Sequence, residues 1–176
     1  VGNYLVKVPE NNILWEENFD SMTAETLGTL TAKGVDVIFK NVIPNDTKRN
    51  NSIGIAKNST AQGELTKNFT KVSEDCVRFT YSVYVEDTMN TPIFVKSSNG
   101  TNYVLAQVYN GAVYHSTTDG AVVNRVCMAE GWVTVENIIN LDTHSNKITV
   151  YDAGGNKLGS GIDAQLHDVD NKGLIS

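Results

Sequence analysis

Carboxylates are the first residues in this sequence that could do hydrolytic chemistry. Cleavage of a glycosidic bond needs two carboxyl groups that flank the bond, about 5 to 10 Å apart. Glu16 and Glu17 are adjacent, so on a strand they point to opposite faces and do not cooperate. Glu86 and Glu136 could share a face of neighbouring strands, but solvated or hydrogen-bonding roles are the favoured interpretation of both. The carboxylates therefore do not predict a hydrolase.

A β-elimination lyase would need an arginine, a histidine or glutamine, and a tyrosine on one face. Arg78, Gln107, Tyr109 and His115 supply these residue types. Pairing across a turn at 110–111, however, places His115 toward the core, where a hydrogen-bonded structural histidine is the favoured interpretation. The sequence also carries no nucleophile elbow, phosphate-binding loop or metal-binding histidine cluster. We therefore expect a protein without catalytic activity, and an enzyme with an unfamiliar active site is the weakest alternative.

A mixture of aromatic and planar polar side chains indicates a binding face instead. Aromatic rings stack on the C–H patches of sugars, while amide, carboxylate and guanidinium groups hydrogen-bond to sugar hydroxyls. Strand alternation predicts that one sheet face collects the members of this set: Arg78, Ser82, Tyr84, Tyr103, Gln107, Tyr109, Tyr114, Trp132, Glu136 and Asn140. The alternative is that loops cover some of these rings as a second small core, and for Trp132 a core position is an equally good interpretation.

Period-two alternation identifies the strands that position these residues. From Val77 to Glu86, large apolar side chains alternate with polar ones, which is typical of a half-buried antiparallel strand. From Tyr103 to Thr117, two strand-like runs flank Asn110-Gly111, the strongest short hairpin signal. This turn pairs Tyr109 with Ala112, Gln107 with Tyr114 and Leu105 with Ser116. The smaller aliphatic residues of the hairpin then face the core.

Two later segments and several earlier ones complete a pattern of about ten short strands. In 132–141, Val133, Val135 and Ile139 share one face that Asn137 interrupts, and 147–158 runs through a strand into a tight turn at 152–156. Further strands are predicted over 13–19, 35–39, 52–57 and 63–69, with a short helical turn over 21–27. The pattern predicts an all-β, two-sheet antiparallel β-sandwich of the jelly-roll type, as a single domain spanning 1–176. A strand-like stretch begins at 173, so a final strand is missing or is replaced by the segment 4–8.

Composition and charge exclude some partners. The chain has a formal net charge of −6 and few basic residues, whereas nucleic-acid binding needs a basic patch. No apolar run of about 18 residues is present, so we expect no membrane insertion. Cys76 and Cys127 fit no zinc motif, and the alternatives are an inter-strand disulfide or two buried thiols.

Three segments together resemble the concanavalin-A-like, laminin-G-like jelly-roll superfamily, in particular its bacterial carbohydrate-binding modules. They are Trp15–Ser21 (WEENFDS), Gly131–Val135 (GWVTV) and Ile148–Gly155 (ITVYDAGG), and the resemblance covers roughly residues 13 to 160. It implies a secreted or cell-surface module that binds a polysaccharide or oligosaccharide on its concave sheet. It also implies a structural calcium, for which Glu17 and Asp20 are the candidate ligands. The chain departs from the family in lacking an acidic pair near its end. A structural or adhesive domain that contacts protein is the main alternative.

Overall fold

A computed structural model of the chain describes residues 16–17, 19, 22, 27–28, 30–40, 52–57, 63–68, 76–96, 102–116, 122–140, 142–143 and 145–163. Two compact units emerge from the contacts, one within 11–70 and the other within 71–175. No described helix is long and apolar enough to cross a membrane. The expectation of one domain over 1–176 stays a prediction.

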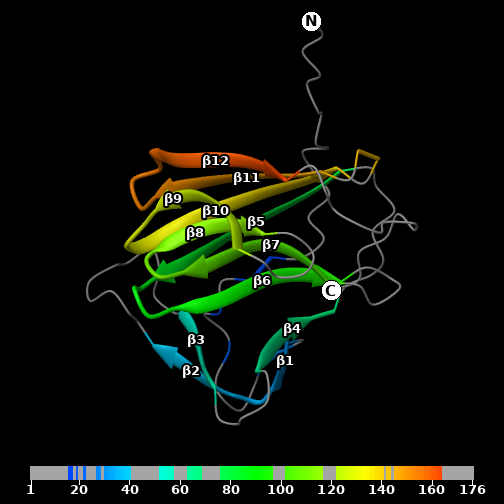
Figure 1. The fold of residues 1–176 in the computed structure, drawn as a ribbon. Helices are drawn as coiled ribbons and strands as arrows, with labels where there is room; N and C mark the ends of the chain where they lie inside the picture. Colours follow the sequence, from blue (N-terminus) through cyan, green and yellow to red (C-terminus); the bar gives the residue numbers. More distant parts are fainter. Residues whose placement is uncertain are drawn as a thin grey trace, which may run out of the picture. The chain divides into compact units, whose positions relative to one another are not determined.

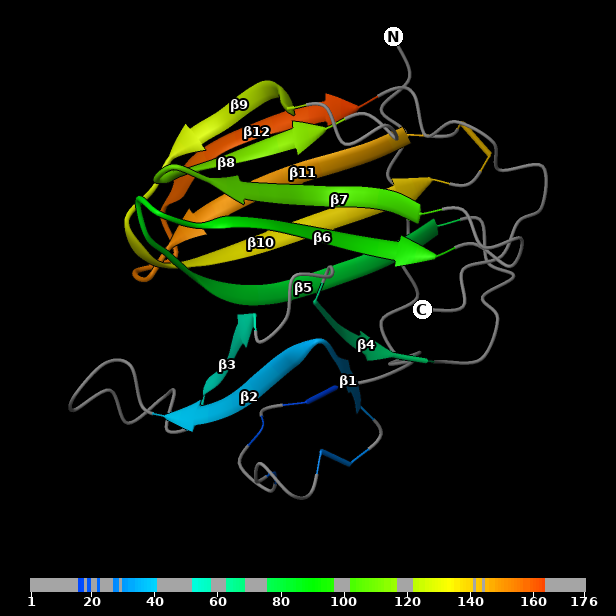
Figure 2. The same ribbon diagram turned by 60° about the horizontal axis from the view of Figure 1, so that its bottom comes forward.

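The larger unit is a sandwich of two four-stranded antiparallel sheets (Figures 1 and 2). Sheet A has the strand order β12-β11-β10-β5, and sheet B has the order β6-β7-β8-β9. The strands are β5 (Cys76–Val85), β6 (Asn90–Lys96), β7 (Asn102–Tyr109), β8 (Ala112–Ser116), β9 (Val122–Met128), β10 (Gly131–Asn140), β11 (Ser145–Asp152) and β12 (Lys157–Asp163). The predicted all-β, two-sheet antiparallel sandwich is thereby confirmed.

The core lies between the two sheets and follows from strand alternation. Along β10, Val133, Val135 and Ile139 are buried while their neighbours are only half-buried. β-Branched residues suit such a strand because they pack well on a pleated surface. Facing them from sheet B are Ala106, Val108 and Val113, all fully buried. On each strand, the side chains that alternate with the buried ones therefore point to the outer side of the sheet.

The hairpin between β7 and β8 forms as the sequence predicts. Asn110 and Gly111 both adopt positive φ, 45° and 68°, as a two-residue type I′ turn requires. The expected pairs Gln107–Tyr114 and Tyr109–Ala112 are confirmed, but the ladder ends there and does not reach Leu105 and Ser116.

A bulge at Leu105 explains why the regular pairing stops. On the β6 side the register also shifts here, because Ile93 pairs with Ala106 and Phe94 pairs with Val104. The carbonyl oxygen of Leu105 instead accepts hydrogen bonds from the side-chain amides of Asn137 (2.9 Å) and Asn146 (3.0 Å) of sheet A. These bonds tie the two sheets together through the core.

The two asparagines are part of a fully buried polar cluster. Both are 0% exposed, and Asn137 Nδ2 donates to Asn146 Oδ1 at 3.0 Å. The Tyr81 hydroxyl donates to Asn137 Oδ1, also at 3.0 Å. Burial raises the pKa of Tyr81, so its hydroxyl stays protonated and able to donate.

Glycines let the edge strands β9 and β12 approach closely. A β-carbon at Gly159 would collide with the Val126 carbonyl oxygen of β9. One at Gly161 would meet His115 Cδ2 of β8 at 3.0 Å. His115 therefore points to the core side of its strand, as the sequence predicts, and its side chain is half-buried. Any larger residue at Gly159 would push the two sheets apart along this side.

The smaller unit contains two antiparallel strand pairs. In one, β1 (Leu30–Lys33) pairs with β4 (Glu64–Lys67), and in the other β2 (Val35–Lys40) pairs with β3 (Ser52–Lys57). The strands predicted over 35–39 and 52–57 are confirmed, and the one over 63–69 is shorter than predicted. The strand predicted over 13–19 is wrong at its end: Glu16, Glu17 and Phe19 are outside any strand. Phe19 has a φ of 65°, which is incompatible with extended backbone.

No disulfide joins the two cysteines. Cys76 is the first residue of β5, and Cys127 is the penultimate residue of β9, near the opposite end of the sandwich. Burial raises the pKa of the Cys127 thiol, so this thiol is protonated and poorly nucleophilic.

Candidate functional site

The outer face of sheet A carries a regular grid of side chains that are polar or aromatic except at Ile138 and Ile162. Register pairing places its residues in four rows across the strands, in the order β5, β10, β11, β12. The rows are Arg78–Ile138–Lys147–Ile162, Thr80–Glu136–Thr149–Ser160, Ser82–Thr134–Tyr151–Lys157 and Tyr84–Trp132. Because directly paired residues lie on the same side of a sheet, these side chains form one surface.

Three aromatic residues surround a pair of hydroxyl groups on this face. Tyr84 and Trp132 are direct cross-strand partners, with ring centroids 5.5 Å apart in an edge-to-face arrangement at 74°. In the next row the Ser82 and Thr134 hydroxyls are hydrogen-bonded at 3.2 Å. Thr134 is also paired with Tyr151 of β11. The arrangement combines rings that can stack with hydroxyls that can exchange their mutual bond for one to a ligand.

A salt bridge joins the two rows that lie farthest from Tyr84 and Trp132. Arg78 Nε lies 3.5 Å from Glu136 Oε2, and these side chains are 47% and 25% exposed. At this exposure solvent screens the pair, so its contribution to stability is small. Both groups keep donor and acceptor positions that a ligand could use, because a guanidinium has five donors and a carboxylate about four acceptor sites.

The sequence-predicted binding residues do not share one face, and this expectation is wrong. Arg78, Tyr84, Trp132 and Glu136 lie on the outer face of sheet A. Gln107, Tyr109 and Tyr114 lie instead on the outer face of sheet B, on the far side of the core. Each strand has the predicted alternation, but the strands belong to two different sheets.

The outer face of sheet B carries a second pair of tyrosines. Tyr109 and Tyr114 have ring centroids 6.3 Å apart, and Tyr109 is 36% exposed. Gln107 is buried, and its amide Nε2 donates to Asn90 Oδ1 at 2.9 Å. Its polar group therefore already has a partner within the sheet. Tyr103 is a residue of β7 whose backbone pairs with Val95.

The candidate catalytic groups are separated. Glu136 pairs with Thr80, and Glu86 lies six residues further along the chain from Thr80. At about 3.4 Å per residue this is roughly 20 Å, beyond the spacing that glycosidic cleavage needs. Of the residues considered for a lyase, Arg78 is on sheet A, Gln107 and Tyr109 are on the outside of sheet B, and His115 faces inward.

The predicted calcium ligands are only partly described. Glu17 Oε1 accepts a hydrogen bond from the backbone N–H of Phe19 at 2.8 Å, whereas Asp20 lies outside the described residues. Among the residues that the structure does describe, no three acidic, histidine or cysteine side chains gather closely enough to hold a metal ion. Calcium binding at Glu17 and Asp20 stays a prediction.

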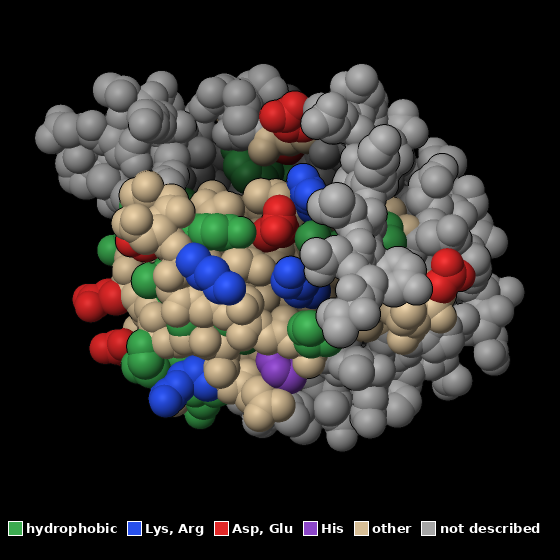
Figure 3. All heavy atoms as spheres, turned by 90° about the horizontal axis from the view of Figure 1, so that it is seen from above, with side chains coloured by type: hydrophobic (Ala, Val, Ile, Leu, Met, Phe, Trp, Pro, Cys, Tyr) green, Lys and Arg blue, Asp and Glu red, His purple; other side chains and the backbone are tan. Residues whose placement is uncertain are grey.

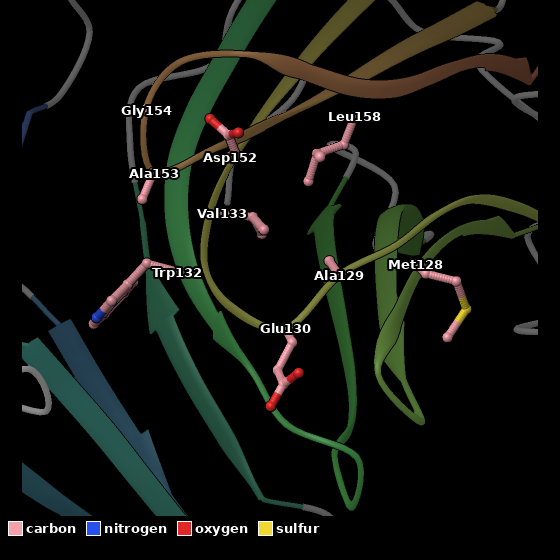
Figure 4. Close-up of a pocket in the computed structure, with 9 residues that line it drawn as sticks. All are labelled: Met128, Ala129, Glu130, Trp132, Val133, Asp152, Ala153, Gly154 and Leu158. Atoms are coloured by element: carbon pink, nitrogen blue, oxygen red, sulfur yellow. The ribbon is translucent and has the colours of Figure 1, made fainter.

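A shallow depression of about 400 Å³ opens at the end of the sandwich, between the β9–β10 and β11–β12 turns (Figure 4). Met128, Ala129, Val133 and Leu158 give it an apolar lining, and the Trp132 indole extends away from them. Asp152 also lines it, but the side chain of Asn156 hydrogen-bonds to this carboxylate and lowers its pKa. The bonds from Asn156 thus hold the Asp152 carboxylate at the β11–β12 turn.

Sequence reasoning missed several residues of the grid. Tyr151 and Lys147 flank a buried run of β11, so their outward direction is readable from the pattern of this strand, whereas Thr149 shares their side by register but is buried. Which residues of β10 lie beside them cannot be read from this pattern, because that requires the register in which β11 pairs with β10.

Comparison with known proteins identifies no relative. No family model matches the chain, and neither the curated proteins nor the solved structures contain a match.

Proposed function

We propose that this protein is a non-catalytic carbohydrate-binding module and that the outer face of sheet A is its binding surface. The observation that supports this most strongly is the position of Tyr84, Trp132 and Tyr151 around the Ser82–Thr134 hydroxyl pair. Sugars present both C–H surfaces and hydroxyls, and this face offers a partner for each.

The geometry of the grid suits an extended ligand. Neighbouring strands are about 4.8 Å apart, so the three long rows of four strands span roughly 14 Å across the sheet. Thr80, Ser82 and Ser160 are exposed along these rows and add hydroxyl groups beside the rings. A chain of several sugar units could therefore contact aromatic and hydroxyl groups in turn.

The resemblance of three sequence segments to concanavalin-A-like carbohydrate-binding modules supports the same function. It also suggests a secreted or cell-surface location, as part of a polysaccharide-degrading or adhesive protein. The β-sandwich agrees with that resemblance, although a fold of this kind hosts many functions.

Affinity gel electrophoresis against a panel of soluble polysaccharides tests the proposal. The variants are Tyr84→Ala and Tyr151→Ala on the outer face of sheet A. Tyr109→Ala is the matched control, since it removes an exposed tyrosine from the opposite sheet. We expect at least one polysaccharide to retard the wild type and the Tyr109→Ala variant, and both sheet A variants to migrate faster. Absence of retardation by every polysaccharide, with a folded protein, would contradict the proposal.

Contact with another protein is the second candidate, and the depression favours it. Met128 and Leu158 line that depression and are 59% and 41% exposed, and apolar side chains exposed together in this way can form a protein-contact patch. If this end of the sandwich binds a protein, Leu158→Ser should abolish self-association or partner binding while leaving polysaccharide retardation unchanged. Sedimentation velocity of both forms measures the first effect.

A further inference from the structure

The outer face of sheet A differs in charge from the chain as a whole. The chain has a formal net charge of −6. Among the described residues of the four paired strands, however, this face carries Arg78, Lys147 and Lys157 and a single acidic residue, Glu136. Figure 3, which views the molecule over β12 and β11, shows Lys and Arg side chains across this side and acidic ones mostly at its margins.

Two of the positive charges are available to a ligand. Arg78 and Glu136 form an ion pair and largely cancel each other. Lys147 and Lys157 are exposed, and neither has an acidic partner among the described residues. As far as the described part of the chain shows, these two ammonium groups can therefore pair with an anion from outside.

The two lysines lie on the β11–β12 side of the grid, two rows apart. Lys157 is paired with Tyr151, and Lys147 lies four residues before Tyr151 on the same strand. At about 3.4 Å per residue along a strand and 4.8 Å between strands, their Cα atoms are roughly 14 Å apart. Tyr151 lies beside Lys157, and the buried Thr149 separates it from Lys147, so one extended ligand could contact the ring and both charges.

Acidic residues gather at the end of the sandwich instead. The turns that join β5 to β6, β9 to β10 and β11 to β12 contain or adjoin Glu86, Asp87, Glu130 and Asp152. Glu86, Asp87 and Glu130 lie beyond the last row of the grid, whereas Asp152 is level with Val133, between its last two rows. These carboxylates disfavour an anion that extends past this end.

We propose that the ligand of this face is an anionic polysaccharide, one that carries carboxylate or sulfate groups. The inference rests on the proposed carbohydrate-binding function and specifies its substrate class. The polymer's rings and hydroxyls contact Tyr151, Thr134 and Ser82, while its acidic groups pair with Lys147 and Lys157. A nucleic acid fits less well, because two lysines on a chain of net negative charge provide few phosphate contacts.

Matched polymers isolate the contribution of charge. Dextran and dextran sulfate differ only in sulfate, and esterified and de-esterified pectin differ only in free carboxylate. Single-stranded DNA serves as an anion without a polysaccharide backbone. Dissociation constants come from the dependence of retardation on polymer concentration in affinity gels, at low and at 0.3 M salt.

The test variant is Lys147→Gln/Lys157→Gln, and Arg125→Gln on the exposed side of sheet B is the control with a matched loss of charge. Each exposed ion pair changes an affinity by up to about five-fold, so the double variant should bind the acidic polymer roughly ten-fold more weakly. Arg125→Gln should bind the acidic polymer as tightly as the wild type does. At 0.3 M salt the affinity of the wild type should fall to nearly that of the double variant. Preference for the sulfated or the carboxylated polymer identifies the acidic group.

The outcomes separate the two proposals. Equal binding of the neutral and acidic members of each pair, unchanged in the double variant, would overturn the anionic ligand and leave carbohydrate binding intact. DNA binding as tight as polysaccharide binding would show a general affinity for polyanions and overturn it too. Failure of every polymer to bind would overturn the carbohydrate-binding function itself.

Discussion

Replacing Asn137 by alanine tests how the sandwich is held together. The Asn137 side chain takes part in three hydrogen bonds, with the Tyr81 hydroxyl, the Leu105 carbonyl and Asn146 Oδ1. The change leaves the Tyr81 hydroxyl without its acceptor and Asn146 Oδ1 without its donor, while the Leu105 carbonyl keeps its bond to Asn146. Each buried group that loses its partner costs about 1 to 3 kcal/mol. With the cavity added, we expect a loss of roughly 3 to 5 kcal/mol.

Urea unfolding monitored by tryptophan fluorescence measures this loss as a lower midpoint at an unchanged slope. Asn124→Ala is the control, because Asn124 is an exposed residue of β9 and its removal should cost under about 0.5 kcal/mol. The double variant Asn137→Ala/Tyr81→Phe should lose less than the sum of the single losses, since the orphaned hydroxyl is also removed. A loss below about 1 kcal/mol for Asn137→Ala, or strict additivity in the double variant, would refute the reasoning.

Three further predictions concern the same unit. Because burial raises the pKa of Tyr81, the unfolded phenol loses its proton first. The free energy of unfolding should therefore be constant below about pH 10 and fall above it by up to about 1.4 kcal/mol per pH unit. In urea titrations from pH 9 to 11, the free energy of unfolding of Tyr81→Phe should depend less on pH than that of the wild type. In a Cys76→Ser background, Cys127 should react with a disulfide reagent at pH 8 only after unfolding, because burial raises the pKa of its thiol; rapid reaction of the folded protein would contradict this. Gly159→Ala should cost about 1 to 3 kcal/mol because its β-carbon meets the backbone of β9, whereas the neighbouring Ser160→Ala should be nearly neutral in thermal unfolding.

Local patterns in the sequence predict individual strands well. The alternation over 77–86 and 132–141 corresponds to β5 and β10, and the Asn110-Gly111 signal corresponds to the β7–β8 turn. Both signals act within a few residues, since side-chain direction alternates along any strand and a two-residue turn needs positive φ. This is the part of the fold that needs no knowledge of distant contacts.

The candidate site required information that the strand patterns do not contain. Alternation shows which side chains share a face of one strand, but it does not show that β5 pairs with β10 while the 103–117 hairpin belongs to the other sheet. The aromatic set was consequently predicted as one surface and lies on two. Asn137 interrupts an apolar run and is visible in the sequence, yet its role depends on a bulge at Leu105 that neither strand pattern predicts.

The most direct test of the proposed binding face compares the migration of three proteins in polysaccharide affinity gels. They are the wild type, Tyr151→Ala and Tyr109→Ala. We expect that the polysaccharide which retards the wild type also retards Tyr109→Ala but has little effect on Tyr151→Ala. Loss of retardation in Tyr109→Ala with full retardation of Tyr151→Ala would contradict it and move the binding surface to the outer face of sheet B.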